Sequence, residues 1–176
     1  MPRIEIDLNP VDALRADAIG KPGKRVFYLQ GEKDGKFVTL LVEKIQLQTL
    51  ALGTQKFFAE LSKENPELPA ANATWNEKDF RLTPPLDPIF RIGEIDLAYD
   101  PELDLVCLVC REFLLEGNPP EDAGVVRFWC TRDQLQALAL WSLELAGRGL
   151  KTCPTCGQPM DPDGHLCPKK NGHKKK

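Results

Sequence analysis

Histidine is scarce in this sequence of 176 residues: the only two, His165 and His173, lie near its C-terminal end. If a metal ion takes one of them, residues 1–149 offer no histidine as a general base, so a serine–histidine or cysteine–histidine mechanism is poorly supported. The sequence also lacks a P-loop, a dinucleotide-binding glycine motif and an HExxH motif. We therefore expect a protein that is not an enzyme.

Long apolar runs are also missing. No run approaches the ~18–20 residues that a membrane-spanning helix needs. The opening residues 1–7 place acidic side chains where a signal peptide has its apolar stretch. We expect a cytoplasmic protein with no membrane contact, whose six cysteines are reduced thiols or metal ligands rather than disulfides.

Charge is distributed unevenly along the chain. Hydrophobic residues make up 42% and charged residues 28%, which is typical of a globular domain with room for a small appendage. Five of the 23 basic residues are lysines in segment 169–176, so the other 18 face all 26 acidic residues and residues 1–168 carry −8. Such a body repels a nucleic-acid backbone on average. Only the lysine tail is suited to attract phosphate, and a solubilising end explains it equally well.

The hydrophobic pattern predicts more strands than helices. Alternating or short apolar runs predict strands over 4–8, 25–30, 37–43, 89–99, 103–115 and 124–130. Helical spacing predicts one helix over 45–63 and another that Thr131 or Asp133 caps and that ends near Ala146. A short helical turn is expected over 11–18.

Residues 64–88 read as a connector between two halves. Five of the 15 prolines lie there. We expect Trp75 and Phe80 to pin this segment to the core, so that it is not a flexible linker.

The two predicted helices begin alike. Segments 43–52 and 131–140 share six identical positions at an offset of 88 residues, and each follows two predicted strands. A hairpin with one helix buries too little apolar surface to be stable alone, whereas two copies around a pseudo-twofold axis form one core.

The fold class that follows is α+β, with internally duplicated strand–strand–helix units, antiparallel sheet and helices on one face. Long edge strands in such a fold are compatible with a homodimer. The expected organisation is a duplicated domain over 1–149, with repeat one at 1–63, the connector at 64–88 and repeat two at 89–149, followed by a zinc-binding tail at 150–176.

The C-terminal tail carries the most specific motif. Cys153-Pro154-Thr155-Cys156-Gly157 matches the zinc-knuckle pattern, and Cys167 supplies a third thiolate ten residues after the knuckle. For the fourth ligand we favour His173, which gives the spacing Cys-x5-His; His165 would need a tighter return, and water or another group is the remaining choice. Three thiolates and one imidazole indicate a structural site that folds the tail. Iron is the main competitor, and a redox pair of the first two cysteines leaves the other ligands unexplained.

The remaining cysteines read as core residues. Cys107 and Cys110 lie three apart in a predicted strand, so their side chains point to opposite faces and do not chelate one ion together. We expect them, and Cys130, to be buried thiols.

Duplicated strand runs closed by a helix share their outline with the Whirly-type and PUR-type single-strand nucleic-acid binders. This analogy concerns the outline of the fold and does not assign function. Such a binder needs aromatic and basic side chains on a sheet face. The candidates are Arg25, Phe27, Phe37 and Lys44 in the first half, and Arg127 and Trp129 in the second.

Several segments together resemble an uncharacterised bacterial family, domain of unknown function 3090, a "repeat protein" family of actinobacteria and Chloroflexi. The resemblance covers nearly the whole chain and lies in residues 2–10, 25–28, 42–47 and the tail from Cys153 to His173. No catalytic residues can be carried over from this resemblance, because none is established for the family.

The leading functional hypothesis is a non-enzymatic binding or adaptor module with a protein partner, which it contacts through the zinc tail and a sheet edge. A single-stranded nucleic-acid binder that uses a sheet face and the lysine tail is the second hypothesis. An enzyme with a pocket between the two repeats is the third, and convergent polar groups in a deep pocket would favour it.

Overall fold

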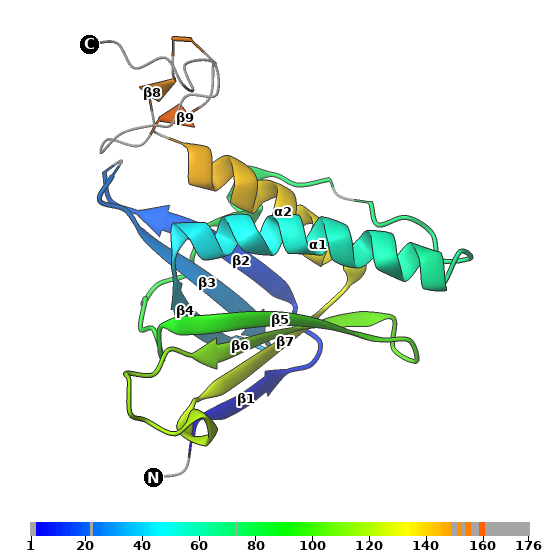
Figure 1. Cartoon of the computed structure of the whole chain (residues 1–176), viewed down its shortest axis with the longest axis horizontal. Helices are drawn as coiled ribbons and strands as arrows, with labels where there is room; N and C mark the ends of the chain where they lie inside the picture. The colour runs from blue at the N-terminus through cyan, green and yellow to red at the C-terminus, as the bar shows by residue number, and fades with distance from the viewer. Residues whose placement is uncertain are drawn as a thin grey trace.

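Two antiparallel three-stranded meanders, each followed by a long helix, form most of the computed structural model (Figure 1). The described residues are 3–21, 23–72, 74–148, 151–152, 154–155 and 159–160. The first unit contains β2 (Ala13–Ile19), β3 (Val26–Lys33), β4 (Lys36–Val42) and α1 (Lys44–Glu64). The second contains β5 (Ile92–Asp100), β6 (Leu105–Glu112), β7 (Val125–Cys130) and α2 (Arg132–Gly147). The α+β class is thereby confirmed.

The units exchange their leading segments. Strand β1 (Glu5–Leu8) precedes the first unit but pairs in parallel with β7, which gives the sheet order β1-β7-β6-β5. Reciprocally, Arg91 precedes the second unit and bridges Leu41 of β4 in parallel, where the Leu41 N–H donates to the Phe90 carbonyl over 3.0 Å. Each sheet therefore includes backbone from both halves of the chain.

Strand β2 corrects the expectation of a helical turn over 11–18. Three alanines raise the helix propensity of this segment, yet Leu14 and Ala16 are buried while Arg15 and Asp17 are partly exposed, which is the period of a strand. Pairing with β3 along all seven residues overrides the local preference.

The core lies between the two sheets and the helices. Most of its largest fully buried side chains come from β3, β4, β6, β7, α1 and α2, and they include Leu29, Leu40, Leu108, Phe128, Leu47 and Leu135. The sheets approach closely at Gly31, where an added Cβ would lie 2.4 Å from the Phe128 ring. Asp34 (φ 50°) and Gly35 (φ 76°) form the two-residue turn of the β3–β4 hairpin, as the Asp-Gly pair predicts.

Positions 88 residues apart play the same part in both helices. Each helix begins with a capping box, formed by Glu43 with Gln46 in α1 and by Thr131 with Gln134 in α2. The buried helix positions match in four pairs: Leu47 and Leu135, Leu50 and Leu138, Ala51 and Ala139, Thr54 and Ser142. The last strands match as well, since Val38, Leu40 and Val42 are buried like Val126, Phe128 and Cys130.

The connector after α1 is held on the core. It contains the short 3-10 helix η1 (Glu77–Phe80), and a second one, η2 (Pro120–Asp122), lies before β7. Phe80 stacks on Trp141 of α2 with ring centres 5.5 Å apart, and Trp75 lies 5.3 Å from the same indole. Further along, the Gln30 amide donates to the Thr83 carbonyl over 3.0 Å and accepts from its N–H over 2.9 Å. Trp75 and Phe80 thus anchor the segment, as expected.

Among the described residues, neither helix is long and apolar enough to cross a membrane.

Candidate binding groove between α1 and β5

An open groove runs between α1 and the edge strand β5, which lie side by side in Figure 1. Its main part has a cavity volume of about 530 Å³ and is bordered by α1 from Ile45 to Glu60 and by β5 from Gly93 to Leu97. A second cavity of about 450 Å³ shares Phe57 and Glu60 with the first, and continues the groove towards the end of α1. The groove therefore follows both elements, which are each about 30 Å long.

One side of the groove is the free edge of a sheet. Five consecutive residues of β5, 93–97, border the groove. Neighbouring side chains in a strand point to opposite faces, so a cavity on one face would contact only every second residue. Contact with all five therefore indicates that the cavity runs along the edge of the strand. At the start of β5 this edge is covered, because the Gln46 amide donates to the Ile92 carbonyl over 3.0 Å. Beyond that point no described strand pairs with it.

The lining is apolar with charged margins. Leu50, Phe57 and Leu97 supply buried or half-buried apolar surface. The charged side chains are one lysine and three carboxylates: Lys56, Glu60, Glu94 and Asp96. Gly53 faces open space, since an added Cβ would meet nothing within 4 Å. The described lining includes no histidine or cysteine.

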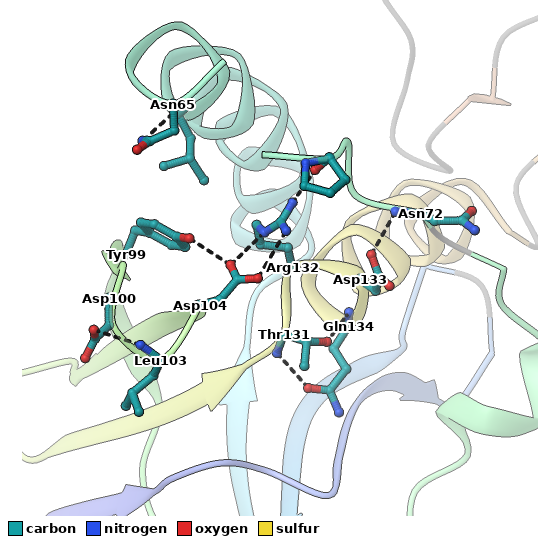
Figure 2. A network of polar contacts seen from close by, with 12 residues as sticks. Asn65, Asn72, Tyr99, Asp100, Leu103, Asp104, Thr131, Arg132, Asp133 and Gln134 are labelled. Atoms are coloured by element: carbon teal, nitrogen blue, oxygen red, sulfur yellow. Dashed lines mark hydrogen bonds and ion pairs between the residues drawn. The ribbon is translucent and has the colours of Figure 1, made fainter. Parts of the chain in front are cut away.

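A polar network fixes the far end of the groove (Figure 2). Asp104, in the β5–β6 turn with φ 50°, accepts from the Tyr99 hydroxyl over 2.7 Å and from Arg132 Nε over 2.9 Å. Arg132 also donates to the Pro69 carbonyl in the segment after α1. One guanidinium thus joins α2, the β5–β6 turn and the connector. Its hydrogen bond lowers the pKa of Asp104, and the Tyr99 hydroxyl adds to this against the opposing effect of desolvation.

Four of the six basic and aromatic residues expected at a nucleic-acid surface are engaged in internal contacts. Arg127 lies 3.0 Å from a Glu5 carboxylate oxygen and 3.3 Å from one of Asp7, and the Trp129 indole also donates to Asp7. On the first unit, Arg25 donates to a backbone carbonyl of α2 over 3.1 Å, and its guanidinium lies 5.0 Å from the Phe27 ring centre.

Phe37 and Lys44, the other expected contacts, sit at opposite ends of β4, Phe37 within the strand and Lys44 at the start of α1. The structure therefore does not assemble the six candidates into one basic, aromatic face.

The three described cysteines are buried thiols. Cys107 and Cys110 occupy opposite faces of β6, as their spacing predicts, and Cys130 lies in the core. Burial raises the pKa of Cys107 to about 11 and that of Cys130 to about 12, and it also raises that of Cys110. These thiols are protonated at neutral pH and poorly suited to bind a metal.

The expected zinc ligands Cys153, Cys156, Cys167 and His173, and the alternative His165, lie outside the described residues. Near them, β8 (Lys151–Thr152) and β9 (Pro159–Met160) pair antiparallel, so the first two cysteines lie in the segment that joins two paired strands. Among the described residues no group of histidine, cysteine or acidic side chains could hold a metal ion.

The sequence pattern named a sheet edge as a contact surface but not which edge. The groove residues carry no motif, because their proximity depends on how α1 and β5 pack across the two units.

A family model described as Protein of unknown function (DUF3090) matches residues 6–167. None of the curated proteins and none of the solved structures matches the chain.

Proposed function

The chain belongs to the DUF3090 family, and we propose that it is a non-enzymatic binding or adaptor module whose groove takes an extended segment of a protein partner. One observation carries the proposal: the free edge of β5 borders an open, largely apolar groove along residues 93–97. An extended peptide that enters the groove would pair its backbone with this edge and place alternate side chains against α1. Such strand addition needs no catalytic group.

The charges of the molecule favour a protein partner over nucleic acid. The two arginines on the outer face of the second sheet are both paired with carboxylates, Arg111 with Asp96 and Arg127 with Glu5 and Asp7. A nucleic-acid ligand would have to displace these carboxylates before either arginine could contact a phosphate. The groove lies between the two units, where the enzyme hypothesis expects a pocket, but its described lining offers neither a histidine nor a cysteine for catalysis.

We also propose that the two units arose by internal duplication. The support is the recurrence, at an offset of 88, of capping boxes and buried positions in both helices, and the reciprocal pairing of β1 with β7 and of Arg91 with Leu41. This arrangement places α1 of one unit beside β5 of the other, which is how the groove forms.

For the tail, we propose a structural zinc ion held by Cys153, Cys156, Cys167 and His173 in a cytoplasmic protein. The support is the knuckle spacing together with the paired strands β8 and β9 on either side of segment 153–158. The zinc would fold the tail rather than react.

The test of the groove uses a fluorescein-labelled peptide of about seven alternating valines and lysines, the length of an ordinary strand. We expect saturable anisotropy and NMR amide shifts confined to residues 93–97 and the facing side of α1. The matched control carries N-methyl groups on alternate backbone nitrogens, which remove ladder donors while keeping every side chain, and it should not bind. Absence of binding, or equal binding of the methylated peptide, contradicts strand addition. Concentration-dependent dimerisation with shifts at the same residues would identify a second copy as the occupant.

A further inference from the structure

The two units contain equivalent grooves, and only one of them is open. Strand register defines the equivalence: Leu29 pairs with Ala16 and Leu40, while Leu108 pairs with Leu97 and Phe128. Because Leu40 and Phe128 are 88 residues apart, Ala16 of β2 corresponds to Leu97 of β5. The groove between α1 and β5 therefore has its counterpart between α2 and β2.

The counterpart is filled by aromatic side chains of the chain itself. Trp141 of α2 is only 1% exposed, and its indole N–H donates to the carbonyl of Ala16 on the free edge of β2 over 2.7 Å. Phe80 stacks on this indole with an interplanar angle of 10°, and Trp75 lies against it. The connector thus occupies the second groove beside a tryptophan that satisfies the strand edge.

In the open groove the tryptophan is replaced by glycine. Gly53 lies 88 residues before Trp141, and the space over it is empty to 4 Å. Leu97, the equivalent of Ala16, borders the same cavity. Glycine in a helix interior is unfavourable compared with alanine, and in the middle of α1 it leaves room beside β5.

The charges around the two grooves are inverted. In the filled groove, Arg148 lies 4.8 Å from the Trp141 ring centre and pairs with Glu144 and with Glu77 of the connector. The equivalent positions in the open groove are Glu60 for Arg148 and Lys56 for Glu144. In the filled groove the connector supplies an acidic residue, Glu77, to the basic Arg148. In the open groove the equivalent position is the acidic Glu60, so a segment that paired with it in the same way would carry a basic residue.

We propose that the groove between α1 and β5 binds an extended partner segment that inserts an aromatic side chain, tryptophan above all, over Gly53. The indole N–H of this tryptophan would donate to the Leu97 carbonyl, and a neighbouring lysine or arginine of the partner segment would face Glu60. This inference rests on the proposed function and names the ligand class of the same groove.

The first test needs no partner, because the chain can supply the indole itself. Gly53→Trp places an indole where Trp141 has its own, and Leu52→Trp is the matched control on the exposed side of α1, where Leu52 is 66% exposed. Both variants are labelled with 5-fluorotryptophan and observed by ¹⁹F NMR. If the new indole is buried in Gly53→Trp, its resonance should shift little between H2O and D2O and should broaden little with a soluble paramagnetic reagent. The new resonance of Leu52→Trp should shift and broaden, because that indole is exposed. A Gly53→Trp chain that fails to fold, or whose new indole is as accessible as the control's, overturns the inference.

The second test compares two labelled peptides that alternate valine and lysine and differ only at the central residue, tryptophan or alanine. On the natural chain we expect the tryptophan peptide to bind at least about tenfold more tightly, as for a buried aromatic anchor. Gly53→Trp should abolish this preference, Leu52→Trp should retain it, and Glu60→Lys should weaken both lysine-bearing peptides.

The outcomes separate the two proposals. Equal binding of both peptides at residues 93–97 overturns the aromatic anchor and leaves strand addition standing. A buried indole in Gly53→Trp without binding of either peptide overturns the proposed function, and with it the partner segment, while locating an indole pocket that the chain alone can fill. Undiminished tryptophan preference in Gly53→Trp places the anchor elsewhere and overturns the inference.

Discussion

Trp141 and Ala16 are joined by a buried hydrogen bond, in which the indole N–H donates to the backbone carbonyl over 2.7 Å although 125 residues separate them. The bond closes the free edge of β2 with a side chain rather than with another strand. It also positions α2 against the first sheet, so that the helix of one unit covers the edge of the other.

Trp141→Phe tests the strength of this closure. The phenyl ring keeps most of the stacking on Phe80 but leaves the Ala16 carbonyl without its donor, so the free energy of unfolding should fall by about 1–3 kcal/mol. Urea denaturation measures the change. The control is Trp129→Phe, because the Trp129 N–H meets an exposed carboxylate that water can satisfy. Equal losses in the two variants would contradict a special role for the buried bond.

Two glycine substitutions should have opposite effects. Gly53→Ala adds a methyl group to open space in a helix interior, so the unfolding free energy should rise by about 0.5–1 kcal/mol. Gly31→Ala places its methyl group 2.4 Å from the Phe128 ring in the core, and it should cost about 1–3 kcal/mol through overpacking. Thermal and urea unfolding check both, and a destabilising Gly53→Ala would show that the groove is narrower than described.

Asp104→Asn should reveal a pH-dependent contribution. Asparagine tolerates the positive φ of this turn, so the variant keeps the backbone but removes the charge and one of the two oxygens that accept from Arg132. Because Arg132 lowers the pKa of Asp104 in the folded state, the stabilisation is present above the unfolded pKa of about 4 and is lost as pH falls through the folded pKa. The difference from the natural chain should be at most about 1 kcal/mol at pH 7, since the carboxylate is half exposed, and should vanish in acid.

Urea titrations between pH 7 and pH 2 measure this difference. Asp96→Asn is the control. Both side chains of the Asp96–Arg111 ion pair are exposed, so the pair should contribute little to the free energy of unfolding. A difference that grows in acid would have the wrong sign and contradict the role of Arg132.

Metal analysis addresses the tail. Protein purified without chelator should contain about one zinc per chain, and Cys156→Ser should remove it. His173→Ala should weaken retention more than His165→Ala if the favoured fourth ligand is right. Cys107→Ala serves as the control, because that thiol is buried and its pKa is raised to about 11. Metal-free protein, or zinc that survives Cys156→Ser, contradicts the site.

Nucleic-acid binding is tested by anisotropy of labelled single-stranded DNA and RNA at two salt concentrations. The full chain is compared with one that lacks residues 169–176. We expect any binding to disappear with the lysine tail or with moderate salt, because the body is acidic. Micromolar binding that survives truncation, and that Arg127→Ala weakens, would restore the nucleic-acid hypothesis.

Local pattern predicted much of the fold. Most strand and helix positions, the Asp34-Gly35 turn and the anchoring of Trp75 and Phe80 follow from periodicity and residue type. The pattern failed at β2, where alanines favour a helix locally and only pairing with β3 decides the outcome. It also gave no sign that β1 joins β7, because partner choice between distant strands leaves no local trace.

The groove illustrates the same limit. The repeated segments 43–52 and 131–140 end directly before Gly53 and Trp141, so the largest contrast between the repeats is visible in the sequence. The meaning of this contrast is not visible in the sequence. It depends on the strand edges that Gly53 and Trp141 face, and these are defined only once β2 and β5 are known to be equivalent. The tail is the opposite case, because the spacing of its cysteines and histidines predicts a site for residues outside the described ones.

The exchange of leading segments between the units bears on how the chain is made. During synthesis, β1 emerges before β7, its pairing partner, which follows more than a hundred residues later in the chain. The first sheet likewise waits for Arg91 to reach Leu41. Neither half can therefore complete its hydrogen bonding from its own residues, and the pairing of β1 must wait until β7 has left the ribosome.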